Sequence, residues 1–155
     1  MKGRRSGKGS RGSIPLESIA ARFRRKGLKL TPQRVAIVRT LSKCRGHPTV
    51  DEVYREVRRS FPMISLNTVY TTLKLLKEMG ELTSVGRGER VARFDTNLST
   101  HHHLICVKCS KIEDLSTETF DLTPPAHGQS GFTVLGYRVE FFGYCENCQG
   151  SRKGG

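Results

Sequence analysis

Cys106-Val107-Lys108-Cys109 and Cys145-Glu146-Asn147-Cys148 are the two stretches that decide how the second half of this chain folds. A Cys-x-x-Cys turn directs two thiolates at one ion, and two such turns complete a tetrahedral shell of four sulfur ligands. The spacing therefore predicts a structural zinc site with the ligands Cys106, Cys109, Cys145 and Cys148. The alternative is two disulfides, which would require an oxidising compartment.

The charge is unevenly distributed over the 155 residues, which are enough for one ordinary domain or two small ones. Residues 1–30 carry a net charge of +9, residues 31–100 carry +5 and residues 101–155 carry −1. Such an asymmetry is typical of a protein whose basic part binds a polyanion such as nucleic acid. The alternative is a solvated basic surface that keeps the protein soluble.

The apolar segments are short. None is long enough to span a bilayer, and the basic N-terminus lacks the apolar core of a secretory leader. We therefore expect a cytoplasmic protein with no membrane partner, in which the cysteines stay reduced and are available to a metal.

Four helices are predicted in the first half, because capping signals there precede apolar residues at helical spacing. The helices are expected to begin at Pro15, Thr31-Pro32, the capping box Thr49-x-x-Glu52 and Ser65. Gly80 is expected to end the fourth helix. The residues predicted to face the core are Leu16, Ile19, Ala20, Phe23, Val35, Val38, Leu41, Val50, Val53, Tyr54, Val57, Leu66, Val69, Leu73 and Leu76.

Two short strands are predicted after these helices, at Leu82–Val85 and Val91–Phe94, with a glycine-containing turn between them. Helices followed by such a hairpin are typical of a winged helix-turn-helix, whose last helix enters the major groove of DNA. The polar residues on the outer face of that helix are Asn67, Thr68, Tyr70, Thr71 and Lys74. The alternative is a small helical bundle with a polar surface.

The second half is predicted to form strands at His102–Val107, Lys111–Leu115 and Phe132–Phe142, with residues 116–131 crossing between strands. Pro124-Pro125 argue against a long helix in that crossing. A unit of about 50 residues has too small a core to be stable alone, so zinc binding is expected to supply the missing stability. The predicted fold class is α+β, with an N-terminal winged helix-turn-helix domain and a small C-terminal α/β zinc-bearing domain.

A second group of candidate metal ligands brackets the segment between the two halves. Its members are His47, Asp95, His101, His103 and Asp114. On an extended segment His101 and His103 share a face, opposite to His102. Imidazole and carboxylate ligands without sulfur suit iron(II) or manganese(II), with zinc or cobalt as competitors. A metal held by both halves would fix their relative angle and so switch DNA binding; alternatively, these are a helix-end histidine, a solvated aspartate and an adventitious histidine run.

Several motifs together resemble the ferric uptake regulator family, over about residues 17–149. They are Leu30-Thr-Pro-Gln-Arg34, His47-Pro-Thr-Val-Asp51, Thr68-Val-Tyr70, Arg93-Phe-Asp95, His101-His-His-Leu-Ile-Cys106 and the two Cys-x-x-Cys pairs. The resemblance implies a homodimeric, metal-dependent transcriptional repressor, although a tetramer is also open. The domains would be a disordered basic arm at 1–16, a winged-helix DNA-binding domain at 17–94, a hinge at 95–101, a dimerisation domain with structural zinc at 102–149 and a tail at 150–155.

Within the family, the chain is most similar to the peroxide-responsive repressors. Their regulatory ligands, three histidines and two aspartates, fall on His47, Asp95, His101, His103 and Asp114. This similarity implies a site for Fe(2+) or Mn(2+), oxidation of His47 or His101 by hydrogen peroxide when iron is bound, and release of operator DNA. The family's DNA contacts fall on Arg34, Asn67, Thr68 and Tyr70, and Tyr70 has the alternative of packing in the core. The chain departs from the family at Pro124-Pro125, where a longer helix is usual.

Other functions make different demands on the sequence. An iron- or other metal-sensing repressor of the same family would bind DNA with metal but would not be damaged by peroxide. An enzyme needs an open metal position and a substrate pocket. The five candidate protein ligands would be enough to saturate the ion, so we expect no enzyme and no small-molecule substrate apart from metal and hydrogen peroxide. A zinc-ribbon RNA binder would need an aromatic stacking platform, which the chain lacks.

Overall fold

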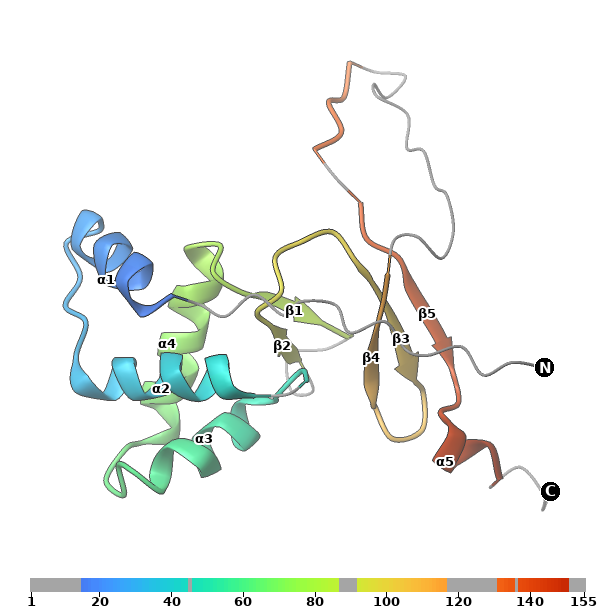
Figure 1. The fold of residues 1–155 in the computed structure, drawn as a ribbon, viewed down its shortest axis with the longest axis horizontal. Coiled ribbons are helices and arrows are strands. Elements are labelled where there is room, and N and C mark those ends of the chain that lie inside the picture. Colours follow the sequence, from blue (N-terminus) through green and yellow to red (C-terminus); the bar gives the residue numbers. More distant parts are fainter. Residues whose placement is uncertain (1–14, 45, 87–91, 117–130, 136, 151–155) are drawn as a thin grey trace. The chain divides into compact units, whose positions relative to one another are not determined.

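The computed structural model describes residues 15–44, 46–86, 92–116, 131–135 and 137–150. These residues form two compact units, one that ends at Leu98 and one that begins at Ser99 (Figure 1). We call the first the helical unit and the second the sheet unit. Most of the predicted basic arm and tail lie outside the described residues. Among the described helices, none has the length and apolarity needed to cross a membrane.

The helical unit contains α1 (Leu16–Arg25), α2 (Pro32–Lys43), α3 (Val50–Arg58) and α4 (Leu66–Glu78). The predicted caps are confirmed. The side chains of Thr31 and Ser65 each accept a hydrogen bond from the backbone N–H three residues further on, and Thr49 and Glu52 form a complete capping box. Local capping chemistry therefore sets where α2, α3 and α4 begin.

The end of α4 is fixed by a glycine turn, as predicted. Gly80 adopts φ of +72°, a conformation that favours glycine. Its N–H donates to the Lys77 carbonyl at 2.9 Å, and the Glu81 N–H donates to the Leu76 carbonyl at 2.9 Å. These two bonds form a Schellman motif, which turns the chain directly into the hairpin.

One apolar cluster forms the core of the helical unit. It consists of Ile19, Phe23, Ile37, Val38, Leu41, Val53, Val57, Ile64, Val69, Leu73, Leu76, Met79, Leu82 and Phe94. Three core predictions were wrong, because Ala20 and Val35 are only half-buried and lie outside this cluster, and Leu66 is 44% exposed. A hydrophobic staple forms at the start of α4. Ile64, which precedes the capping residue, lies in the core with Val69, whereas Leu66, which follows the capping residue, does not.

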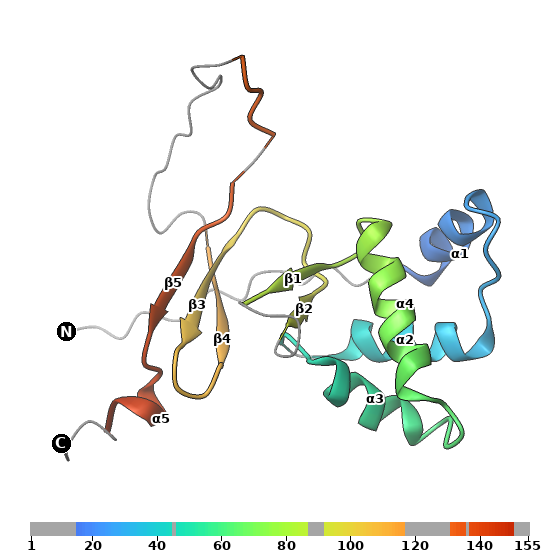
Figure 2. The same ribbon diagram turned by 180° about the vertical axis from the view of Figure 1, so that it is seen from behind.

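A two-stranded antiparallel hairpin follows α4, as Figure 2 shows from behind. Its strands are β1 (Thr83–Val85) and β2 (Arg93–Asp95), with Ser84 opposite Phe94. The predicted hairpin is therefore confirmed, with strands one or two residues later than expected. Most of its connecting turn, residues 87–91, lies outside the described part of the chain.

The sheet unit contains β3 (His102–Cys106), β4 (Ile112–Leu115), β5 (Glu140–Gly143) and α5 (Glu146–Gln149). The strand order is β4-β3-β5. β4 pairs with β3 in the antiparallel sense, and β5 pairs with β3 in the parallel sense. Parallel strands need a crossover connection, but residues 117–130 of the predicted crossing lie outside the described residues.

The prediction of one strand over Phe132–Phe142 was wrong. The strand begins only at Glu140, and its pairing with β3 runs from His103 opposite Glu140 to Cys106 opposite Gly143. Strand length is limited by the partner, and β3 has only five residues. The short helix α5, which carries Cys148, was not predicted.

Candidate metal centres

Four cysteines from two separate turns of the sheet unit converge on one point. Cys106 ends β3 and Cys109 lies in the turn after it, whereas Cys145 is the N-cap of α5 and Cys148 lies within that helix. Their sulfur atoms all lie within 4.8 Å of one another. The turns close alike, because Ser110 N–H donates to the Cys106 carbonyl at 2.9 Å and Cys148 N–H donates to the Cys145 carbonyl at 2.8 Å.

The spacing of these sulfurs fits a tetrahedral ion. Zinc–sulfur bonds of about 2.3 Å at tetrahedral angles place sulfurs about 3.8 Å apart, and the Cys109 and Cys145 Sγ atoms are 3.6 Å apart. All five cysteines are described, and none forms a disulfide. The arrangement therefore fits four-thiolate zinc and disagrees with the disulfide alternative.

Two cysteines of this cluster have pKa values shifted in opposite directions. Hydrogen bonds from the backbone of Cys145 and Cys109 lower the pKa of the Cys106 thiol to about 6. Burial, together with hydrogen bonds to the other three sulfurs, raises the pKa of the Cys148 thiol to about 12. Zinc binds cysteines as thiolates, so it displaces the protons that remain on the cluster when it binds.

Within the helical unit, His47 and Asp95 lie together although 48 residues separate them. His47 belongs to the connection between α2 and α3, and Asp95 is the last residue of β2. The Nε2 atom of His47 and the Oδ2 atom of Asp95 are 3.7 Å apart. The other carboxylate oxygen, Oδ1, accepts a hydrogen bond of 2.8 Å from the Asn97 N–H, so the orientation of the Asp95 carboxylate is fixed.

Within the sheet unit, two histidine side chains lie near one carboxylate. His103 on β3 lies opposite Asp114 on β4. The Nε2 atoms of His101 and His103 lie 3.8 and 3.9 Å from the same Oδ1 atom of Asp114. The Nδ1 atom of His101 lies 2.8 Å from the Ser99 carbonyl, so it carries the proton and leaves Nε2 for a metal.

His102 points the other way, as strand alternation predicted. It is fully buried, and its ring centroid lies 5.7 Å from that of Tyr137. Its Nδ1 atom accepts a hydrogen bond of 3.3 Å from the Val139 N–H. Burial lowers the pKa of His102, as do His101 and His103. His102 is therefore a neutral core histidine.

Within each unit, the imidazole and carboxylate groups are spaced nearly as two ligands of one metal ion would be. Ligand atoms about 2.1 Å from one ion at right angles lie about 3 Å apart, and the observed separations of 3.7 to 3.9 Å need only a small closure. This donor set contains no sulfur, which favours iron(II) or manganese(II). The two kinds of centre in this chain therefore differ in ligand chemistry.

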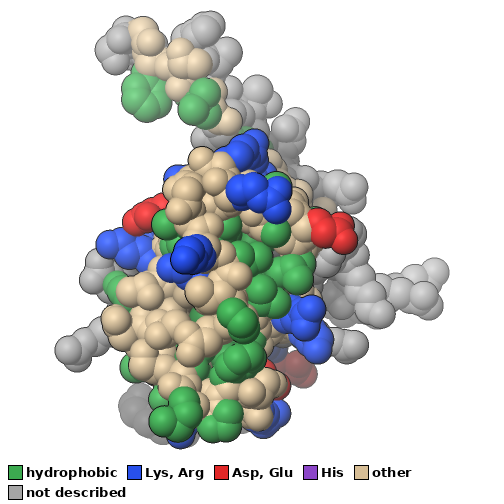
Figure 3. Space-filling view, turned by 90° about the vertical axis from the view of Figure 1, so that its left-hand side faces the viewer, with side chains coloured by type: hydrophobic (Ala, Val, Ile, Leu, Met, Phe, Trp, Pro, Cys, Tyr) green, Lys and Arg blue, Asp and Glu red, His purple; other side chains and the backbone are tan. Residues whose placement is uncertain are grey.

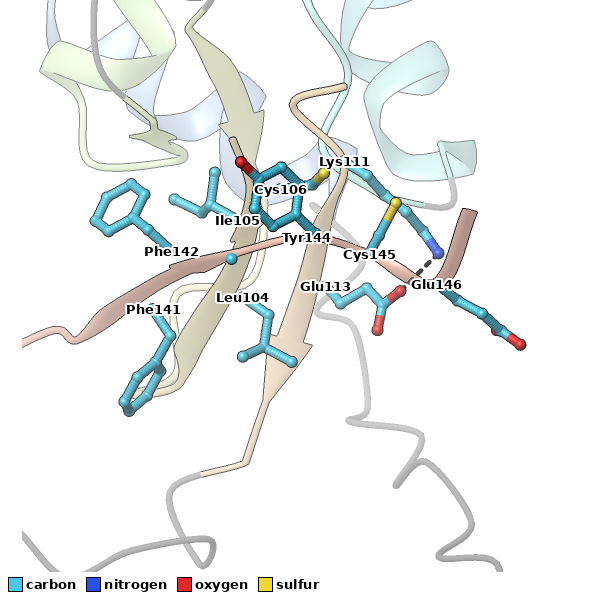
Figure 4. Close-up of a pocket in the computed structure, with 11 residues that line it drawn as sticks. Leu104, Ile105, Cys106, Lys111, Glu113, Phe141, Phe142, Tyr144, Cys145 and Glu146 are labelled. Carbon is cyan, nitrogen blue, oxygen red and sulfur yellow. Dashed lines mark ion pairs between the residues drawn. The ribbon is translucent and has the colours of Figure 1, made fainter. Parts of the chain in front are cut away.

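A cavity of about 340 Å³ lies beside the cysteine cluster and is lined by residues of β3, β4, β5 and the start of α5 (Figure 4). The sulfur-bearing side chains of Cys106 and Cys145 lie at one end, and Leu104 and Phe141 lie at the other. Leu104 and Phe141 are each 40% exposed. This end of the cavity is therefore apolar and open, whereas Lys111, Glu113 and Glu146 also line the cavity.

The residues predicted to contact DNA have different surroundings. Asn67 and Tyr70 are exposed on α4, with Tyr70 47% exposed, so Tyr70 is not a packed core residue. Thr68 Oγ1 lies 2.8 Å from Ser65 Oγ, and Arg34 donates from Nη1 to the Lys29 carbonyl at 2.6 Å. Figure 3 shows more Lys and Arg than Asp and Glu on one face, with apolar side chains between them.

Sequence reasoning gave no role to two features of the helical unit. Met63 is 93% exposed just before α4, and no periodicity marks it because it lies in a loop. Arg93, two residues before Asp95, donates from Nη1 to the His47 carbonyl at 2.9 Å. The signals in the sequence were the Arg93-Phe-Asp95 motif and the closeness of a cation to a predicted ligand.

Comparison with known proteins places this chain in one family. The profile of the Ferric uptake regulator family matches residues 25–142. The chain is 38% identical over 135 residues to the peroxide-responsive repressor PerR of Staphylococcus epidermidis, which covers 86% of this chain and 90% of that protein.

Two solved structures have a similar two-domain fold. One is the ferric uptake regulator of Helicobacter pylori, described with three functional metal-binding sites, at a TM-score of 0.71 and 22% identity over 88% of this chain and 92% of that one. The other is a zinc-bound manganese uptake regulator, at a TM-score of 0.62 and 29% identity over 86% and 99%. The chain therefore belongs to the ferric uptake regulator family, whose members are metal-dependent transcriptional regulators rather than enzymes.

Proposed function

We propose that this chain is a homodimeric transcriptional repressor that binds operator DNA while Fe(II) or Mn(II) fills its regulatory site, and that peroxide releases it. The ligands of that ion would be His47, Asp95, His101, His103 and Asp114. The observation that carries the proposal is the pairing of imidazole Nε2 atoms with carboxylate oxygens at 3.7 to 3.9 Å, separately in each unit. The protein would act in the cytoplasm, where its cysteines stay reduced.

The division of the ligands gives the ion a mechanical role. His47 and Asp95 belong to the helical unit, and the other three ligands belong to the sheet unit. An ion bound to all five joins the units and favours one arrangement of them over others. In a dimer, that arrangement would set the spacing of two recognition helices for two half-sites on DNA.

Peroxide sensing would depend on oxidation of one of the ligand histidines. The chemistry that iron(II) supplies when bound is the reduction of hydrogen peroxide. One oxygen atom of the peroxide would end on a ring carbon of His47 or His101, and the other would leave as water. The oxidised ring is a poorer ligand, so the five-ligand set is broken and the two units are no longer held together.

The DNA-binding surface is proposed to be α4 and the hairpin. Tyr70 and Asn67 are supported as base contacts by their exposure on α4. Thr68 and Arg34 are engaged with Ser65 and Lys29, so we propose that they contact phosphates at the edge of the groove. The basic charge of the first hundred residues supports a polyanionic partner.

A second copy of the chain is proposed to bind through the sheet unit. Leu104 on β3 and Phe141 on β5 lie opposite each other in the sheet, and each is 40% exposed (Figure 4). Exposed large apolar side chains gathered on one sheet are typical of a protein interface. A homodimer would cover them.

A repressor that senses a metal without peroxide chemistry is the second candidate. The match with a manganese uptake regulator at 29% identity favours it. The two candidates share the fold, the zinc site and the DNA-binding surface, and they differ only in whether a bound ligand histidine is oxidised.

The test is mass spectrometry of iron(II)-loaded protein before and after a short anaerobic pulse of hydrogen peroxide, with parallel measurement of DNA binding by fluorescence anisotropy. We expect one added oxygen on the peptide with His47 or His101, together with loss of DNA binding. Manganese-loaded protein is the control and should show neither change. Unmodified histidines with metal-dependent DNA binding would select the second candidate, and full DNA binding without regulatory metal would refute both.

A further inference from the structure

Arg93 connects the end of the hairpin to the segment that carries His47. Its Nη1 atom donates to the His47 backbone carbonyl at 2.9 Å and lies 3.3 Å from the Glu52 Oε2 atom. The side chain of Arg93 is 21% exposed, so this charge-assisted contact is sheltered from solvent for most of its surface. One guanidinium therefore contacts the backbone of a predicted ligand and the first turn of α3.

The backbone around Arg93 strengthens the same connection. Phe94 N–H donates to the Pro48 carbonyl at 2.9 Å, and Arg93 and Thr49 form an isolated antiparallel bridge. The Glu52 carboxylate that faces Arg93 also accepts the Thr49 N–H at 2.8 Å, within the capping box of α3. The segment from His47 to Thr49 is therefore held alongside β2 by backbone and side-chain contacts.

This arrangement explains why His47 and Asp95 meet. Asp95 is the last residue of β2, two residues after Arg93. The contact of Arg93 with the His47 carbonyl fixes the position of the His47 backbone beside that strand. With both backbones fixed, Nε2 of His47 and Oδ2 of Asp95 lie 3.7 Å apart. We propose that Arg93 is a positioning residue for the regulatory metal, which aligns the two ligands of the helical unit before the metal binds. This inference rests on the proposed function of His47 and Asp95 as ligands.

The helical unit offers a matched control for Arg93. Arg22 on α1 pairs through Nε with the Glu81 carboxylate at 2.5 Å and donates from Nη1 to the Met79 carbonyl at 3.4 Å. Arg22 thus makes the same two kinds of contact, with a glutamate and a backbone carbonyl. Neither Glu81 nor Met79 is a predicted ligand, so loss of Arg22 should affect folding and leave the metal unaffected.

The experiment is titration of zinc-loaded protein with Mn(II), in which electron paramagnetic resonance measures the free ion. Four variants are compared with the wild type: R93M, R93K, R22M and H47A. We expect the dissociation constant for Mn(II) to rise about tenfold in R93M, as for loss of an outer contact to a metal ligand. R93K should lie between R93M and the wild type, because an ammonium makes fewer directed hydrogen bonds than a guanidinium.

H47A should lose more affinity than R93M, and R22M should bind Mn(II) within about twofold of the wild type. The zinc content should remain unchanged in all four variants. A second measurement reports position directly in metal-free protein: R93M should accelerate hydrogen exchange of the Phe94 amide more than that of other amides in the helical unit, whereas R22M should not single out Phe94. A general loss of folding would instead accelerate exchange throughout the helical unit.

The possible failures are distinguishable. If H47A loses Mn(II) affinity while R93M and R93K bind as the wild type does, Arg93 is not a positioning residue but His47 remains a ligand. If H47A itself binds Mn(II) normally, His47 is not a ligand, and both the proposed metal site and the role of Arg93 are overturned. If R22M weakens Mn(II) binding as much as R93M, the effect is general destabilisation and the positioning role is wrong.

Discussion

The helical unit and the sheet unit are stabilised in different ways. The helical unit has a continuous apolar core to which α1 to α4 and the hairpin all contribute. In the described part of the sheet unit, the buried side chains are Ile105, two histidines and two of the four converging cysteines. An apolar core stabilises a domain without help, whereas a small sheet with few buried apolar groups needs a metal.

The two sets of candidate metal ligands also differ in how they are distributed between the units. All four cysteines belong to the sheet unit, so a zinc ion there stabilises one unit. The histidines and aspartates are divided between the units, so a shared ion would connect them without being needed for either to fold. On this comparison, we expect the ligand set confined to one unit to be structural and the divided set to be regulatory.

Loss of a zinc ligand should have the largest effect and should be confined to the sheet unit. We expect C148S to lose its zinc and the cooperative folding of β3 to β5, since binding of a structural zinc contributes on the order of 10 kcal/mol. Zinc content by mass spectrometry and circular dichroism check this. C44S is the control, because Cys44 lies outside the cluster, and it should keep its zinc. A C148S protein that retains one zinc and its fold would contradict the contrast.

A core substitution should affect the helical unit alone. Leu73 is fully buried on α4, and L73A should reduce the free energy of unfolding of this unit by about 2–5 kcal/mol. The control is Leu66, which lies on the same helix but is 44% exposed. L66A should change the free energy of unfolding by less than about 0.5 kcal/mol. Urea unfolding measures both. Loss of zinc from L73A would show that the units are not stabilised independently.

Substitution of a divided ligand should weaken metal binding and leave folding unchanged. D114N should raise the dissociation constant for Mn(II) by about tenfold to a hundredfold, because Asp114 faces both His101 and His103. E113Q is the neighbouring control, since Glu113 pairs with Lys111 at 2.6 Å. Isothermal titration compares the two variants, and equal affinities would remove Asp114 from the proposed site.

The smallest effect concerns a single helix cap. T49A removes the Thr49 hydroxyl that accepts the Glu52 N–H at 3.2 Å and should cost about 1 kcal/mol of stability in the helical unit. T71A, which removes an exposed hydroxyl in the middle of α4, should cost less. Thermal unfolding of both variants measures the difference. A larger loss in T71A would argue that capping is not what fixes α3.

Local chemistry explains which parts of the fold were predictable. Thr31, Thr49, Ser65 and Gly80 each fix a helix end through groups within a few residues, so the sequence alone was sufficient. The assignment of Leu66 to the core failed because helical periodicity does not say whether the core reaches the first residue of a helix. The strand predicted at Phe132–Phe142 was too long because its length depends on pairing with β3, a contact distant in sequence.

The candidate sites also divide into features set by local sequence and features set by contacts distant in sequence. The cysteine cluster was predicted from spacing, because each Cys-x-x-Cys turn is local and four sulfurs have one common use. The contact of Arg93 with the His47 carbonyl joins residues 46 positions apart. No short-range pattern encodes such a contact, so its role emerged only from the fold.

The most direct test of the divided site is small-angle X-ray scattering of zinc-loaded protein with and without one equivalent of Mn(II). If one ion joins the helical unit to the sheet unit, Mn(II) should narrow the distribution of interatomic distances in the wild type and leave D114N unchanged at the same concentration. If the wild type binds Mn(II) and its scattering does not change, the ion does not couple the two units and the account is wrong.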